Sequence, residues 1–69
     1  MTETAAPEVR LGNDIARQFA HLPDGDAVAR IADHLLRFWD PRMRARLRDL
    51  VAAGDPDLDA RVVVAAELL

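Results

Sequence analysis

The sequence predicts an all-α fold, a small bundle of three to four short helices. Apolar residues recur at helical spacing in four segments, and proline, glycine or aspartate bounds each segment. No stretch alternates between apolar and polar residues as a half-buried strand does. Because 69 residues leave room for one core, we expect a single helical domain over residues 9–69. We expect residues 1–8 to form a disordered tail before it.

The first helix is expected over residues 8–22. Its large apolar side chains form one stripe, and its small residues form a ridge beside that stripe. The stripe consists of Leu11, Ile15, Phe19 and Leu22, and the ridge of Gly12, Ala16 and Ala20. We expect the stripe to face the core and the ridge to allow a neighbouring helix to approach closely.

The second helix is expected to start near Ala27. The preceding Pro23 to Asp26 segment is typical of a turn, and Asp24 or Asp26 can cap the helix. Apolar residues cover more than half of its circumference, which places it at the centre of the fold. The end of this helix, with Phe38 and Trp39, has more apolar surface than three short helices can bury.

A third helix is expected from Pro41 to Ala53, with Asp40 as its N-cap and Gly54 as its stop. Arginines surround its apolar stripe of Met43, Leu47, Leu50 and Val51, at positions 42, 44, 46 and 48. Such a pattern is typical of an interface with an arginine rim. It is equally typical of a solvated face on which arginine stems cover the edge of the core.

The last segment, from Leu58 to Leu69, has apolar residues at helical spacing, and Asp55, Asp57 or Asp59 can cap it. The run of valines from 62 to 64 favours a strand by propensity. We nevertheless predict a helix, because a lone strand would have no partner to pair with.

Composition argues against several classes of function. The net charge of −3 disfavours binding to a phosphate backbone, and no apolar run is long enough to span a membrane. The absence of cysteine excludes disulfides and fits a reducing cytoplasm. A core this small gives marginal stability, so weak self-association of the isolated chain is also expected.

The residues that catalysis needs are scarce. The chain has no serine, cysteine, tyrosine or lysine, and its three glycines stand too far apart for a phosphate-binding loop. His21 and His34 fall on different helices without metal-ligand spacing. We therefore expect no enzymatic activity, no metal and no cofactor.

The most specific stretch is Phe38-Trp39-Asp40-Pro41-Arg42-Met43-Arg44. Together with Ala32-Asp33-His34, the segment from Asn13 to Phe19, and Leu58-Asp59, it resembles the delta subunit of bacterial NAD-dependent, molybdenum-containing formate dehydrogenases. The resemblance covers nearly the whole chain from about Leu11. It implies a cytoplasmic accessory subunit without cofactors, which docks on the catalytic alpha subunit and supports assembly or stability of the active enzyme.

The same stretch has the composition of a docking corner. Tryptophan and arginine are enriched among interface hot spots, and an Asp-Pro bend fixes the direction of neighbouring side chains. The expected protein-binding residues are Arg37, Phe38, Trp39, Asp40, Pro41, Arg42, Met43 and Arg44. We expect the indole and the guanidinium groups to point outward, although an inward Trp39 with an Asp-Pro pair that only caps is the simpler alternative.

Two other functions remain open on the sequence. One is a small helix-turn-helix DNA-binding module that uses the arginine-rich third helix, although this helix has few side chains suited to reading base edges. The other is a transient maturation factor for the same formate dehydrogenase, which leaves after cofactor insertion.

Overall fold

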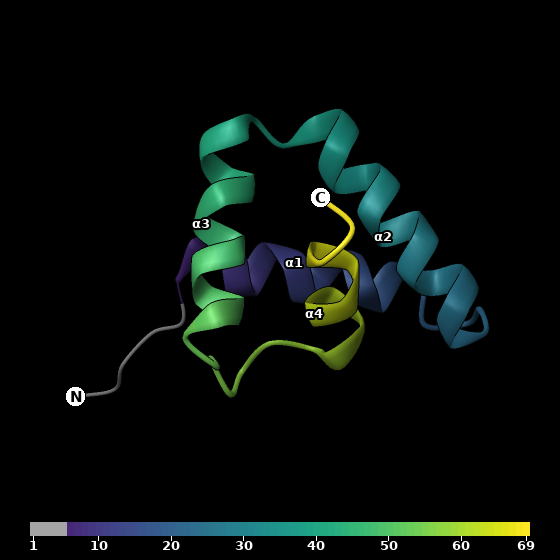
Figure 1. Cartoon of the computed structure of the whole chain (residues 1–69). Coiled ribbons are helices and arrows are strands. Elements are labelled where there is room, and N and C mark those ends of the chain that lie inside the picture. The colour runs from purple at the N-terminus through teal and green to yellow at the C-terminus, as the bar shows by residue number, and fades with distance from the viewer. Residues whose placement is uncertain (1–5) are drawn as a thin grey trace.

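The computed structural model describes residues 6–69, which form four helices and no strand. The helices are α1 (Pro7–Gln18), α2 (Asp24–Phe38), α3 (Pro41–Ala52) and α4 (Ala60–Ala66). Figure 1 shows their arrangement. The all-α prediction is confirmed. Residues 1–5 of the predicted tail lie outside the described part, and α1 begins at Pro7, before the predicted end of the tail.

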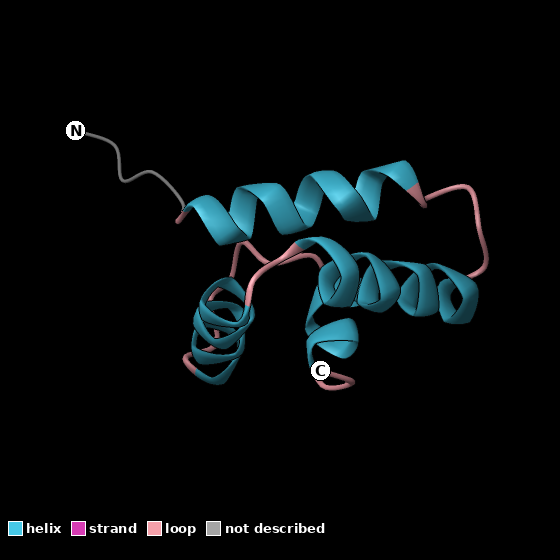
Figure 2. Cartoon of the chain, turned by 90° about the horizontal axis from the view of Figure 1, so that it is seen from above, coloured by secondary structure: helices cyan, strands magenta, loops and turns pink. Residues whose placement is uncertain are grey.

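The other three helices all pack against the short α4. From the corner at residues 39–40, α2 and α3 diverge, and α4 fills the space between them (Figure 1). Seen from above, α1 runs along one side of the molecule, and α4 lies on the opposite side (Figure 2). α4 contacts all three other helices and packs most extensively against α2. Within residues 6–69, no helix is both long and apolar enough to cross a membrane.

One apolar core joins the four helices. Ile31, Leu35, Leu47, Val9 and Val62 are its largest fully buried side chains. The buried residues of α2, Ala27, Ile31, Ala32 and Leu35, lie on one side of the helix. Leu36 is 53% exposed, so α2 is not covered on two sides as predicted for a central helix. Around this core pack partly buried side chains such as Phe19, Met43 and Val51.

The buried face of α1 differs from the predicted stripe. Ile15 is buried, but Leu11 is 42% exposed, and the helix ends before Phe19. Instead the small residues Gly12 and Ala16 face the core. The reason is close packing: a Cβ added at Gly12 would lie 3.3 Å from Val62 Cγ1, so α1 is turned to place its narrow ridge against α4.

The start of α2 was also predicted incorrectly. The helix begins at Asp24, its N-cap is Pro23, and no side chain caps it. Asp24 and Asp26 lie inside the first turn, where their negative charges interact favourably with the helix dipole. Aspartate therefore marks the beginning of this helix through its charge, not through a capping hydrogen bond.

The ends of α3 follow the sequence prediction. Asp40 Oδ1 accepts a hydrogen bond from Met43 N at 2.8 Å, and Pro41 occupies the first turn. At the other end Gly54 has φ +74, and the backbone N–H groups of Gly54 and Asp55 donate to the carbonyls of Val51 and Leu50. This pair of bonds is a Schellman motif, which requires a left-handed residue and so favours glycine.

The valine run from 62 to 64 is helical, as predicted, and Asp59 is the cap of α4. Its carboxylate accepts hydrogen bonds from Arg61 N at 2.8 Å, Arg61 Nε at 3.0 Å and Arg61 Nη2 at 2.9 Å. The side-chain bonds from Arg61 lower the pKa of Asp59 below its ordinary value, and partial burial opposes them only in part. The start of α4 is therefore held by charge-assisted hydrogen bonds.

Candidate docking surface

The corner between α2 and α3 is built from two extended residues and held by side chains. Trp39 (φ −91, ψ 141) and Asp40 (φ −77, ψ 167) leave the helical conformation. At Asp40 the cause is Pro41, because the residue directly before proline is pushed out of the α region. The Asp40 cap then starts α3, and Arg44 Nη1 donates a hydrogen bond to the carbonyl oxygen of Trp39. These contacts fix the angle at which the two helices meet.

Trp39 points into the molecule, so the expectation of an outward indole was wrong. Its side chain belongs to the core cluster, and the residue is only 7% exposed. The extended backbone at Trp39 ends α2 and allows the ring to enter the core. The ring lies near α1, since a Cβ added at Gly12 would be in ordinary van der Waals contact with it, 4.0 Å from Trp39 Cη2.

Phe38 is the aromatic residue that the corner presents to solvent. It is 70% exposed, the highest value among the exposed large apolar residues of the described part. Its ring centroid lies 4.8 Å from that of His34, one helical turn earlier, and the ring planes are tilted by 47°. We name the side chains of His34, Phe38, Pro41 and Arg42 the corner surface.

The arginines of the predicted site have different surroundings. Arg37 pairs with Asp33 at 3.2 Å, with both side chains largely exposed, so this pair holds it weakly. Arg44 is half-buried and bonded to the chain itself. Arg42 is exposed and makes no ion pair with any residue of the described range 6–69. Met43 packs against the core and contributes little free surface.

Sequence reasoning missed His34 as a part of this surface. The spacing of four residues to Phe38 could have revealed the contact, because such pairs are neighbours on a helix. Leu36 is also 53% exposed. It lies almost opposite Phe38 around α2, however, so the two do not form one patch.

The corner surface suits binding better than chemistry. It combines an exposed aromatic ring, a proline and a free guanidinium on a fixed bend, and its one titratable side chain besides arginine is His34. No group of three or more histidine or acidic side chains in residues 6–69 could hold a metal ion. Aromatic and arginine side chains are the types enriched at protein interfaces.

The sequence matches the family described as the NADH-dependent formate dehydrogenase delta subunit, FdsD, over residues 9–66. The chain belongs to this family. The predicted relationship is thereby confirmed, and the matched range contains all four corner-surface residues of this delta subunit. No curated protein and no solved structure matches the chain.

Proposed function

We propose that this delta subunit is a non-catalytic accessory subunit of formate dehydrogenase that docks on the catalytic alpha subunit through the corner surface. Docking would support assembly or stability of the active complex. Membership of the delta-subunit family supports a role within that enzyme. The observation that carries the docking proposal is the 70% exposure of Phe38 on the same corner as Arg42, which is exposed and makes no ion pair within residues 6–69.

Physical arguments support this surface as the contact. Covering an aromatic ring removes apolar area from water, which is the main driving force of association. Arg42 can add a bidentate contact with a carboxylate of the partner. Because the Asp40 cap and the Arg44 bond already fix the bend, less conformational entropy is lost on binding.

The eight predicted binding residues thus divide into two roles in this proposal. Arg37, Phe38, Pro41 and Arg42 are exposed and would touch the partner. The other four would hold these residues in position through the core, the helix cap and the bend: Trp39, Asp40, Met43 and Arg44. His34 joins the contacting group through its ring contact with Phe38.

The test is co-purification with a tagged catalytic subunit. The double variant F38S/R42E removes the ring and reverses the charge, and we expect it to reduce the retained delta subunit by about tenfold or more, as loss of a hot-spot cluster does. The matched control is R10E/L11S, which alters an exposed arginine and a 42% exposed leucine on α1. Equal retention of both variants and the wild type would contradict docking through the corner.

Two further measurements separate the alternatives. If the chain is a transient maturation factor, it is absent from active enzyme that has its full cofactor content. If it is a helix-turn-helix DNA-binding module, it binds duplex DNA with an affinity that falls steeply with salt. The family match and the net charge of −3 favour the subunit role over DNA binding.

We place this subunit in the cytoplasm, in agreement with its lack of cysteine.

A further inference from the structure

The charges of α3 are placed where they do not help the helix to form. Helices α1 and α2 have acidic side chains in the first turn and an arginine in the last turn, which is the order that the helix dipole favours. Asp40 caps α3, but the helix has no acid in its first turn and no base in its last turn. Its arginines instead form two pairs of like charges four residues apart, Arg42 with Arg46 and Arg44 with Arg48, and such pairs repel each other.

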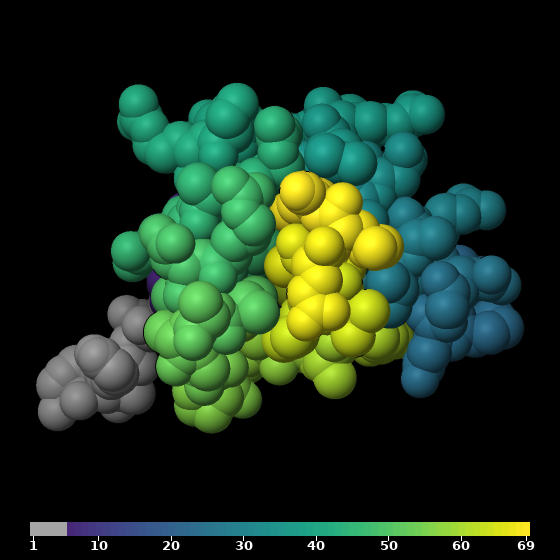
Figure 3. Space-filling model, in the orientation of Figure 1, coloured from purple at the N-terminus to yellow at the C-terminus, as the bar shows by residue number. Residues whose placement is uncertain are grey.

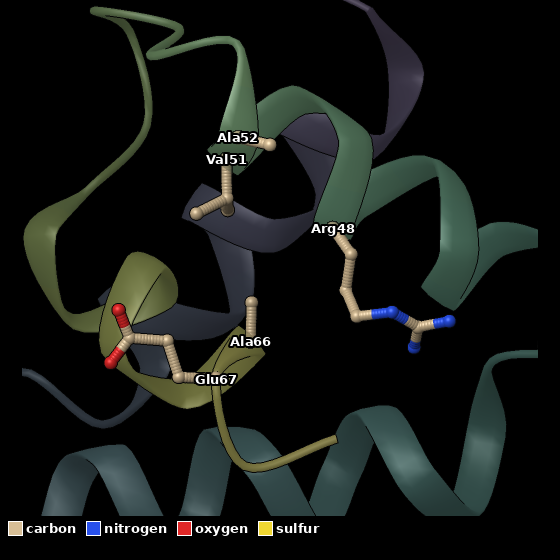
Figure 4. A pocket seen from close by; sticks show the side chains of 5 residues that line it. All are labelled: Arg48, Val51, Ala52, Ala66 and Glu67. Atoms are coloured by element: carbon tan, nitrogen blue, oxygen red, sulfur yellow. The ribbon is translucent and has the colours of Figure 1, made fainter.

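The four arginines of α3 have different surroundings within the protein. Arg44 donates to a backbone carbonyl of the bend. Arg48 reaches along the groove between α3 and α4, a space of about 200 Å³ with valine and alanine side chains in its lining (Figure 4). Arg42 and Arg46 are exposed, line no part of this groove, and make no ion pair within residues 6–69. The charges of Arg42 and Arg46 are therefore available to a partner.

Arg42 and Arg46 are neighbours on the outward side of α3. At 3.6 residues per turn they are about 40° apart around the helix axis, and their Cβ atoms are about 6 Å apart. The buried Leu47 is about 100° or more from both. In the space-filling view the first half of α3 adjoins the corner at the upper left, and its side chains project from the body of the molecule (Figure 3). Two guanidinium groups at this spacing can bind two carboxylates together, each through a bidentate contact.

An exposed acid limits the length of this positive stretch. Asp49 falls on the same outward side of α3, about 60° from Arg46 around the helix axis. It would repel the phosphates of a nucleic acid, and the net charge of −3 adds to that repulsion. The exposed ring of Phe38 on the adjoining corner needs an apolar cover, which a phosphate backbone does not offer. The surface therefore suits a short acidic segment of a protein better than a polyanion.

We propose that the corner surface extends along α3 to Arg46 and recognises an acidic segment of the partner protein. Two carboxylates of this segment would pair with Arg42 and Arg46, and an apolar side chain beside them would cover Phe38. Acids three or four residues apart on one helix of the partner have the required spacing. Their binding also removes the repulsion between the two arginines, which the isolated chain retains. The inference rests on the proposed docking through the corner and adds the chemistry of the partner's surface.

The test is the dissociation constant of the full chain for formate dehydrogenase complex purified without this subunit, measured over a series of salt concentrations. We expect the wild-type constant to rise with salt, because salt screens the paired charges. R46Q keeps part of the side-chain stem but removes the charge. It should raise the constant by about fivefold or more at low salt, and its difference from wild type should shrink at high salt.

Two further variants separate the charge from other effects. The matched control R30Q removes the charge of an exposed arginine in the middle of α2 and should leave the constant within about twofold of wild type. F38S removes only the apolar ring, so it should raise the constant at every salt concentration and leave the salt dependence as in wild type. Circular dichroism of each variant confirms that it is folded.

The two proposals fail in different ways. If neither F38S nor R46Q changes the constant, the corner is not the docking surface, and the acidic segment is overturned with it. If F38S raises the constant but R46Q behaves as R30Q does, docking through the corner stands and recognition of an acidic segment is overturned. An R46Q effect of equal size at every salt concentration would also overturn it, because the stem and not the charge would then matter. Weaker binding of R46Q to duplex DNA, without a change toward the complex, would assign these arginines to nucleic acid instead.

Discussion

Asn13 on α1 is hydrogen-bonded to the backbone of Asp59, the residue that caps α4. Asp59 N donates to Asn13 Oδ1 at 2.9 Å, and Asn13 Nδ2 donates to the carbonyl oxygen of Asp57 at 2.7 Å. One amide side chain therefore satisfies a donor and an acceptor of the loop before α4. This contact joins distant parts of the chain and sets where α4 begins.

The variant N13A should lower the free energy of unfolding by about 1–2 kcal/mol, because two backbone groups lose their partner. N13D should be at least as damaging, since a carboxylate cannot donate to the Asp57 carbonyl. Urea denaturation measures both. The control is Q18A, an exposed amide on the same helix, and an effect of N13A no larger than that of Q18A would argue against the role of Asn13.

Replacing the exposed glycines Gly54 and Gly25 with alanine should change the stability of the protein in opposite directions. G54A forces a side chain into the left-handed region at φ +74 and should cost about 1 kcal/mol. G25A lies in the first turn of α2 with no atom within 4 Å of the new Cβ, and it should stabilise the protein by up to about 1 kcal/mol. Thermal denaturation of the two variants should show melting temperatures on either side of the wild-type value.

Trp39 and Phe38, although adjacent, should differ sharply in their effect on stability. W39A removes a buried ring and should cost about 3–5 kcal/mol, enough to unfold much of so small a domain. F38S alters a 70% exposed side chain and should change stability by about 0.5 kcal/mol or less. Chemical denaturation compares them, with W39F as a milder core variant.

The fluorescence of the single tryptophan gives an independent check. A buried indole emits at shorter wavelength than a hydrated one, so emission from Trp39 should shift to longer wavelength on unfolding. Native emission already at the wavelength of free tryptophan would show that the ring is not buried. In that case W39A should not cause the large loss of stability expected for a buried ring.

Local signals in the sequence predicted much of this fold. Asp40, Pro41 and Gly54 determine the ends of α3 through side-chain and backbone geometry that involves few residues. The helical spacing of apolar residues likewise predicted α4 in spite of its valines. Such features depend on neighbours in the chain, so they can be read without knowing the tertiary packing.

The sequence predictions were wrong where packing between helices determines which residues are buried. Leu11 and Gly12 both lie near the apolar side of α1, and only the approach of Val62 selects the glycine side as the buried one. The inward turn of Trp39 likewise depends on the core that all four helices build together. Periodicity identified an apolar end on α2 but could not decide which of its two aromatic residues enters the core.

The stability of the protein should fall in acid in part because of Asp59. Hydrogen bonds from the Arg61 side chain lower its folded pKa below the ordinary value of 3.8, so the folded state binds this proton less readily than the unfolded chain does. The stabilisation is complete above the ordinary pKa and is lost as pH falls through the lower folded value.

The variant D59N keeps an acceptor for the cap but has no charge to titrate. Its melting temperature should lie below that of wild type at pH 7, and the difference should shrink as the pH is lowered through the folded pKa of Asp59. R61Q, which removes the guanidinium, should move the acid transition to higher pH because the pKa of Asp59 then returns toward its ordinary value. A difference between wild type and D59N that stays constant from pH 7 into strong acid would mean that the Asp59 charge does not stabilise the start of α4.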